Sequence, residues 1–184
     1  MRALTVVFLM LVIAACATGP VVDFDERQDF STYRTFAFIS DKPLMLDEGA
    51  VGASPLLEGR VVRVTRELLT AQGYTFAEER GQADFVVGFT VGARDKLRVD
   101  SYPDMYRANY GRWGWGGSYY MREEVDVDQY TEGTLALDIY DVSDRKPVWH
   151  GVATRRITKR MRENSEETLQ EVIAEILSGF PPQK

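Results

Sequence analysis

The sequence predicts an α+β fold in which two helices pack on one face of a mostly antiparallel sheet of four to five strands, with a long glycine- and aromatic-rich loop. Two observations predict it. Apolar residues alternate with polar ones over 22–24, 85–91 and 135–139, the period of half-buried strands. Apolar residues spaced three and four apart follow 54–55 and fill 164–180, the period of amphipathic helices. Elements that each have one apolar side pack into two layers.

The first half of the chain is expected to hold three strands and one helix. Strands are predicted at 22–24 and 35–39, followed by a loop over 41–53 and, after the helix, by a strand over 84–93. Ser54-Pro55 opens the helix, because a serine caps backbone donors and proline loses no hydrogen bond there.

Gly73 should end this helix, with Tyr74 folding back as the apolar contact that accompanies a glycine cap. A strand, helix and strand in succession form a right-handed crossover. The strands near Phe36 and Phe85 are therefore predicted to be parallel.

The second half is expected to form a hairpin and a helix. The hairpin covers 131–157 and turns at 141–147, where polar residues and a proline cluster. Asn164 is predicted to cap the last helix, with Glu167 three residues later completing a capping box. The helix ends near Gly179.

The N-terminus has the layout of a bacterial secretory signal over residues 1–15, with one basic residue, an apolar run and small residues. The run would reach only about 20 Å as a helix, short of the roughly 30 Å hydrocarbon core. Ala14-Ala15-Cys16 resembles a lipobox, which implies cleavage and lipidation at Cys16. Residues 16–20 then form a short tether to a single domain over 21–184.

Composition excludes several classes of function. The net charge is −6, and removing residues 1–15 with their one arginine leaves 21 basic against 28 acidic residues, or −7. An acidic body does not suit nucleic acid. Cys16 and His150 are the only residues of their kinds, so no internal disulfide, thiol nucleophile, Cys/His zinc site or histidine cluster is expected. We expect no metal and no cofactor.

The order of short motifs resembles a family of bacterial lipoproteins, domain-of-unknown-function family 4136. The matching residues span nearly the whole mature chain and are Asp23-Phe24-Asp25, Asp29-Phe30-Ser31, Tyr33, Thr35-Phe36-Ala37, Gly73-Tyr74, Ala83-Asp84-Phe85, Glu132-Gly133-Thr134-Leu135, Asp138, Val148-Trp149, Gly151 and Phe180-Pro181-Pro182, together with the glycine-tryptophan loop. His150 departs from the pattern, since arginine is commoner there. The resemblance implies a lipid-anchored envelope domain and supplies no activity. Ala17, rather than aspartate, after the cysteine resembles the lipoprotein sorting pattern for the outer membrane, which implies a place on its periplasmic face.

The loop over 101–120 is the candidate binding segment. Rigid amphipathic rings among glycines give a large contact area at low entropy cost, and they suit lipid headgroups and the apolar faces of sugars. The alternative is that the rings pack over the hairpin. The ring residues are Tyr102, Tyr106, Tyr110, Trp113, Trp115, Tyr119 and Tyr120.

Three further groups of polar residues favour structural interpretations. Glu124, Asp126 and Asp128 alternate along a strand, where a solvated acidic face is favoured over a calcium or acid/base site. The basic run over 155–162 is favoured as a charged strand end rather than a headgroup site. His150 lacks a recognisable nucleophile motif around it.

We therefore expect a non-catalytic envelope lipoprotein that binds an envelope protein, glycan or lipid through 101–120. The runner-up is a structural component that self-associates through a sheet edge or the loop. A hydrolase of envelope glycans that uses two acids such as Glu124 and Glu132 is the third hypothesis.

Overall fold

The computed structural model describes residues 20–50, 53–105 and 121–183, and at positions 48, 98–105 and 121–127 it describes the backbone only. The predicted signal peptide and Cys16 lie outside these residues. The helices are α1 (Leu57–Ala71), α2 (Lys159–Glu163) and α3 (Ser165–Leu177), with 3₁₀ turns η1 (Phe30–Thr32), η2 (Glu48–Ala50) and η3 (Arg80–Gln82). The strands are β1 (Val21–Phe24), β2 (Thr35–Phe38), β3 (Leu44–Leu46), β4 (Thr75–Phe76), β5 (Phe85–Met105), β6 (Met121–Asp141) and β7 (Pro147–Arg156).

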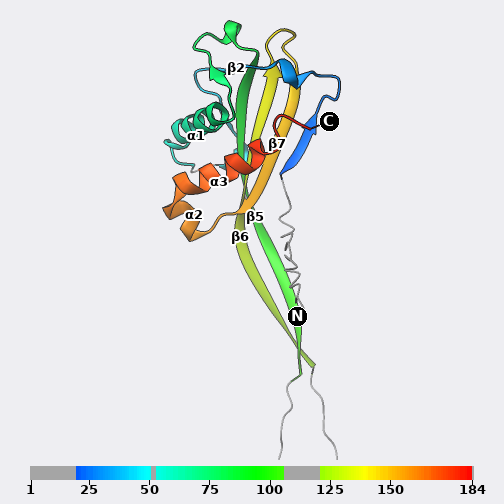
Figure 1. The fold of residues 1–184 in the computed structure, drawn as a ribbon. Helices are drawn as coiled ribbons and strands as arrows, with labels where there is room; N and C mark the ends of the chain where they lie inside the picture. Colours follow the sequence, from blue (N-terminus) through cyan, green and yellow to red (C-terminus); the bar gives the residue numbers. More distant parts are fainter. Residues whose placement is uncertain (1–19, 51–52, 106–120, 184) are drawn as a thin grey trace, which may run out of the picture.

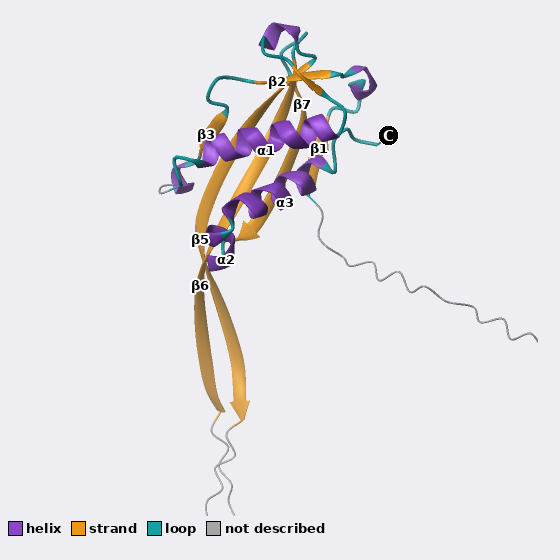
Figure 2. Cartoon of the chain, turned by 60° about the vertical axis from the view of Figure 1, so that its left-hand side comes forward, coloured by secondary structure: helices purple, strands orange, loops and turns teal. Residues whose placement is uncertain are grey.

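The strands form one sheet with the order β1-β7-β6-β5-β2-β4, and β3 pairs with β5 beside β2. The β1–β7, β7–β6 and β6–β5 pairs are antiparallel, whereas β2 and β3 run parallel to β5, and β4 runs parallel to β2. All three helices lie on one side of this sheet (Figures 1 and 2). The predicted α+β class is therefore confirmed.

The structure differs from the prediction in detail, with three helices and seven strands in a mixed sheet among the described residues. The loop expected over 41–53 contains β3 and η2, and β4 follows α1. β3 has three residues, β4 has two and α2 has five. Elements this short have no measurable hydrophobic period in the sequence. Only their backbone hydrogen bonds in the folded chain identify them.

The predicted crossover is confirmed, because β2 lies parallel to β5 with Phe36 opposite Phe85. The core lies between the helices and the covered face of the sheet. Phe36 and Phe85 are fully buried there, Trp149 of β7 is 2 % exposed, and Ile173 of α3 packs in the same cluster. α1 and α3 run parallel, since Arg60 donates to Ser165 at their N-terminal ends and Gln72 donates to the Leu177 carbonyl at their C-terminal ends.

The hydrogen bonds at the helix ends confirm one predicted cap and show that another is wrong. Gly73 has φ +99°, and the Tyr74 N–H donates to the Leu69 carbonyl at 3.1 Å, which is the glycine cap that the sequence predicted. The capping box at Asn164 is wrong, because its side chain makes no cap hydrogen bond. The Asn164 N–H instead donates to the Arg160 carbonyl and closes α2, so this residue joins two helices.

The most distinctive feature is a two-stranded extension of the sheet, which we call the arm and define as residues 95–105 of β5 and 121–131 of β6. β5 and β6 pair over their full length, from Phe85 opposite Asp141 to Met105 opposite Met121. β3 leaves β5 at Val91 and β7 leaves β6 at Glu132. Ten residue steps at about 3.4 Å give the arm a length of about 34 Å. Figures 1 and 2 show it projecting from one end of the domain.

The arm corrects the expected extents of two strands and of the loop. The strand predicted over 84–93 continues to Met105, and the hairpin strand expected from 131 begins at Met121. Residues 101–105 of the predicted loop are therefore strand. Pro103 is compatible with this strand, because its backbone lies at a position that faces away from β6, where its missing N–H breaks no bond between β5 and β6.

Candidate functional site

The predicted binding segment divides at the end of the arm. Tyr102 lies in β5 with its backbone opposite Glu124 of β6. The remaining ring residues of that segment lie outside the described residues and are Tyr106, Tyr110, Trp113, Trp115, Tyr119 and Tyr120. They connect the two strand ends of the arm along the chain, so the arm is the candidate site that the structure describes.

The root of the arm is braced across its two strands. Lys96 of β5 forms an ion pair with Glu132 of β6 at 2.5 Å, and hydrogen bonding to Glu132 raises the pKa of Lys96 above its ordinary value. On the other face, the Thr131 hydroxyl donates to Asp95 at 2.8 Å. These contacts hold β5 and β6 together just where the flanking strands end.

β7 adds a second brace from the side. Arg156, its last residue, forms an ion pair with Asp128 at 2.9 Å, and its guanidinium lies 4.7 Å from the ring centroid of Tyr130. Both partners are on β6, inside the arm. These contacts link the arm to the end of β7.

The alternating acids Glu124, Asp126 and Asp128 occupy strand β6, as predicted. Asp128 is engaged by Arg156. Within the described residues, no group of three or more His, Cys, Asp and Glu side chains is placed to hold a metal ion. Glu124 and Glu132 are eight residues apart on one strand, so their Cα atoms are about 26 Å apart. That pair is too distant for glycoside hydrolysis, which needs carboxyl groups within about 10 Å.

The basic run over 155–162 covers the end of β7 and α2. Arg155 pairs with Glu175 of α3, and Arg156 with Asp128. Arg155 and Arg160 also line an open hollow of about 480 Å³ between α2 and α3. Its walls carry both signs of charge, with Glu167 and Glu171 among the lining residues.

His150 lies on the sheet face that is opposite the helices. Its Nδ1 is 2.7 Å from the Asp138 carboxylate, and both side chains are partly exposed. Asp23 is its neighbour in the β1–β7 register. The arrangement is an exposed surface pair between adjacent strands.

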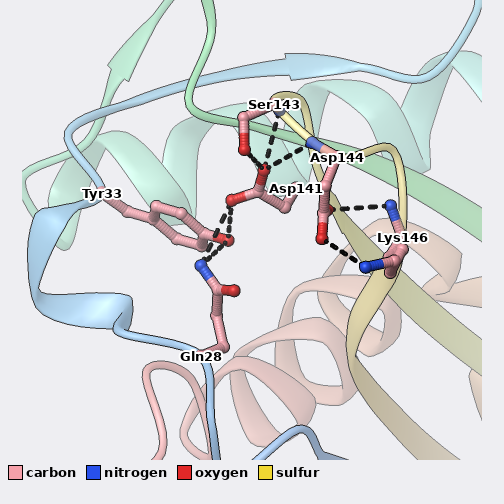
Figure 3. A network of polar contacts seen from close by, with 6 residues as sticks. All are labelled: Gln28, Tyr33, Asp141, Ser143, Asp144 and Lys146. Atoms are coloured by element: carbon pink, nitrogen blue, oxygen red, sulfur yellow. Dashed lines mark hydrogen bonds and ion pairs between the residues drawn. The ribbon is translucent and has the colours of Figure 1, made fainter.

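A buried polar network at the far end of the sheet was not predicted from the sequence (Figure 3). Asp141, 8 % exposed, accepts hydrogen bonds from the Tyr33 hydroxyl at 2.8 Å and the Gln28 amide at 3.2 Å. Its other oxygen accepts from the Ser143 N–H at 2.7 Å, the Ser143 hydroxyl, and the Asp144 N–H at 3.3 Å. The network ties the turn at η1 to the β6–β7 turn.

The electrostatics of this network are those of a structural carboxylate. Burial by itself raises the pKa of Asp141, but the hydrogen bonds from Ser143 and Tyr33 outweigh it and hold that pKa below its ordinary value. Burial, followed by the hydrogen bond to Asp141, raises the pKa of Tyr33 far above its ordinary value. Asp141 therefore stays ionised and Tyr33 stays a donor.

Fold and candidate site together define a two-layer α+β domain with a protruding β arm. The sequence over residues 20–182 matches the family model "Domain of unknown function (DUF4136)". The chain belongs to this family. No curated protein matches the sequence. In the described part of the chain, no helix is long and apolar enough to cross a membrane.

Several solved structures share the fold at low sequence identity. A DUF4136 family protein from Bacteroides thetaiotaomicron has a TM-score of 0.51 at 15 % identity, covering 88 % of this chain and 95 % of that chain. The PelC dodecamer from Paraburkholderia phytofirmans has a TM-score of 0.50 at 14 % identity, covering 90 % and 98 %. A PDZ domain protein from Parabacteroides distasonis has a TM-score of 0.50 at 15 % identity, covering 90 % of this chain and 36 % of that one.

Proposed function

We propose that this protein is a lipid-anchored, non-catalytic component of the bacterial cell envelope, held on the periplasmic face of the outer membrane by lipid on Cys16. The arm presents the ring-rich segment over 106–120 to a protein, glycan or lipid of the envelope. The observation that carries the proposal is the 21-residue length of β5 and of β6, which extends the arm about 34 Å from its root to Met105 and Met121, the residues that flank that segment in the chain.

The geometry of the arm supports a presenting role. Ion pairs at 2.5 and 2.9 Å link its two strands to each other and to β7 at the root of the arm. The segment over 106–120 contains no acidic residue and contains two arginines. Aromatic rings with a few cations suit headgroups, sugars and acidic partners.

The anchor is tested by fractionation. Cys16→Ser should move the full chain from the membrane fraction to the soluble fraction and abolish metabolic labelling with palmitate, because the acyl chains provide the affinity for the bilayer. Ala17→Ser serves as the matched control and should stay in the membrane fraction. A Cys16→Ser protein that remains bound to the membrane would refute the anchor.

The binding role is tested by envelope pull-downs with the Trp113→Ala/Trp115→Ala variant. It should lose partners that the parent retains, because aromatic anchors dominate such contacts. The matched control replaces two exposed apolar residues of β3, Met45 and Leu46, by alanine. This control variant should retain all partners of the parent. An identical partner list for parent and tryptophan variant would remove the segment from the proposal.

Self-association is a second candidate function. The PelC structure is of a dodecamer. In this chain, the specific observation that favours self-association is an arm whose strands both extend beyond their flanking strands.

A further inference from the structure

The arm has two outer strand edges, and in the part of the chain that the structure describes no third strand flanks either one. The β5 edge is free of β-pairing beyond Val91, and the β6 edge beyond Glu132. An isolated two-stranded ribbon is only marginally stable in water, and unpaired edges accept further strands. An additional strand on each edge would therefore stabilise the arm.

The register shows which backbone groups face outward on each edge. The Asp47 N–H donates to the Val91 carbonyl at 2.8 Å, so odd-numbered residues of β5 direct their N–H and C=O groups away from β6. The Ile157 N–H donates to the Thr131 carbonyl at 2.8 Å, so odd-numbered residues of β6 direct theirs away from β5. In an antiparallel β5–β6 pair between two copies, odd residues must therefore bond to odd residues.

The charges at even positions of the two strands are complementary. β5 carries Arg94, Lys96, Arg98 and Asp100, and β6 carries Arg122, Glu124, Asp126 and Asp128. With Arg98 opposite Glu124 of the next copy, all four positions oppose a residue of the other sign. A shift of two residues in either direction places at least one like-charged pair together, either Arg98 with Arg122 or Asp100 with Glu124.

The same register pairs two apolar residues at one odd position. It sets Leu97 opposite Val125 of the next copy. Leu97 is 68 % exposed in the single chain, where its cross-strand neighbour is Gln129. Pairing between copies would cover an apolar side chain that the domain itself leaves in water.

From the edges, the charges and this exposed residue, we infer that the arm joins copies of this chain side by side, with β6 of one copy pairing antiparallel with β5 of the next. Because β5 and β6 run in opposite directions within each copy, this pairing keeps all copies in one orientation. The inference rests on the proposed function in one respect, since lipid anchors in one membrane require that common orientation. Such a head-to-tail interface closes into a ring or continues as a row.

Paired cysteines test the register in the full chain. Leu97→Cys/Val125→Cys should form disulfides between copies under mild oxidation and give a ladder of dimers, trimers and larger species on non-reducing gels. Within one chain the two positions are four residues out of register, about 13 Å apart, which is too far for a disulfide. A ladder therefore reports contacts between copies.

Two controls accompany this variant. Leu97→Cys/Gln129→Cys should give an intramolecular disulfide and run as a monomer, since these residues face each other in one chain. Leu97→Cys alone should also stay a monomer. A dimer from Leu97→Cys alone would mean that two β5 edges meet, and would overturn the inference, as would a double variant that stays monomeric.

A charge exchange gives a second test in the same cysteine background. Arg98→Glu alone and Glu124→Arg alone should each slow formation of the ladder about fivefold, because each places like charges opposite one another. An equimolar mixture of the two variants should restore it. Arg27→Glu in the turn after β1 and Glu171→Arg on α3 make the same charge changes away from the arm and should have no effect. Equal slowing by these controls would overturn the inference.

The two proposals fail separately. Membrane fractionation of the same samples reports the anchor, and the gel reports the pairing. Protein in the membrane fraction without a ladder contradicts the pairing alone, whereas a ladder from soluble protein contradicts the anchor alone.

Discussion

Asp141→Asn tests whether the buried network in Figure 3 stabilises the fold as a charged group. The substitution keeps the size of the side chain and one acceptor oxygen. If that oxygen retains the donors from Ser143 and Asp144, an amide NH₂ faces the Tyr33 hydroxyl and the Gln28 amide. Two charge-assisted hydrogen bonds are lost or weakened.

The expected loss of stability at pH 7 is about 2 kcal/mol. A hydrogen bond to a charged group contributes roughly 1.5–3 kcal/mol and one between neutral groups roughly 0.5–1.5, so each of the two donors loses about 1 kcal/mol. For a domain of this size, the loss lowers the melting temperature by about 4–8 °C. Urea unfolding followed by tryptophan fluorescence measures the loss in free energy of unfolding.

The pH dependence separates charge from shape. Because the folded-state pKa of Asp141 is depressed, its contribution is fully present above the unfolded carboxyl pKa of about 3.9 and is lost as the pH falls through the folded pKa. The stability difference between wild type and Asp141→Asn should stay constant from about pH 8 to 5 and shrink below about pH 4. Asp144→Asn, at an exposed ion pair with Lys146, should show little change. A difference that persists unchanged at pH 3 would refute the reasoning.

Three further substitutions test buried packing and backbone conformation. Thermal unfolding measures the change in stability that each one causes. Thr65→Val should raise the free energy of unfolding by about 1 kcal/mol, because Thr65 is fully buried and its hydroxyl has no partner among the described residues; a loss would reveal a missed partner. Gly151→Ala should cost about 1–3 kcal/mol, since the added methyl would lie 2.2 Å from the Trp149 ring. Gly73→Ala should cost about 1 kcal/mol, because φ is +99° there with open space around it. Unchanged stability of the Gly151 variant would contradict the close approach to Trp149, and unchanged stability of the Gly73 variant would contradict the left-handed backbone conformation.

Periodicity predicted the faces of the main strands and the parallel crossover. Phe85, Val87 and Phe89 were placed on one side of a strand, and all three are at most 1 % exposed. Leu137 and Ile139 of the facing strand are fully buried as well. Such residues are determined locally, because a strand with one apolar side has only one way to face the core.

The candidate site was predictable only in part. The acids of β6 were expected on a strand, but β5 was expected to end at residue 93, whereas it continues through Pro103 to Met105. A proline is compatible with a strand when its backbone faces an unpaired edge. Which edge lacks a neighbour depends on where β3 and β7 end, and the residues of the arm do not encode that.

The sequence by itself determined the class of fold, the face that each main strand buries, and the glycine that ends α1, since each depends on residues within one turn or a few strand positions. Only the tertiary structure decided the length of the arm, the pairing of β3 and β4, and the partners of Asp141. Those depend on segments far apart in the chain, such as Tyr33 and Asp141, which are 108 residues apart. A local pattern fixes which side of an element is apolar, whereas the identity of its neighbour follows from the packing of the whole domain.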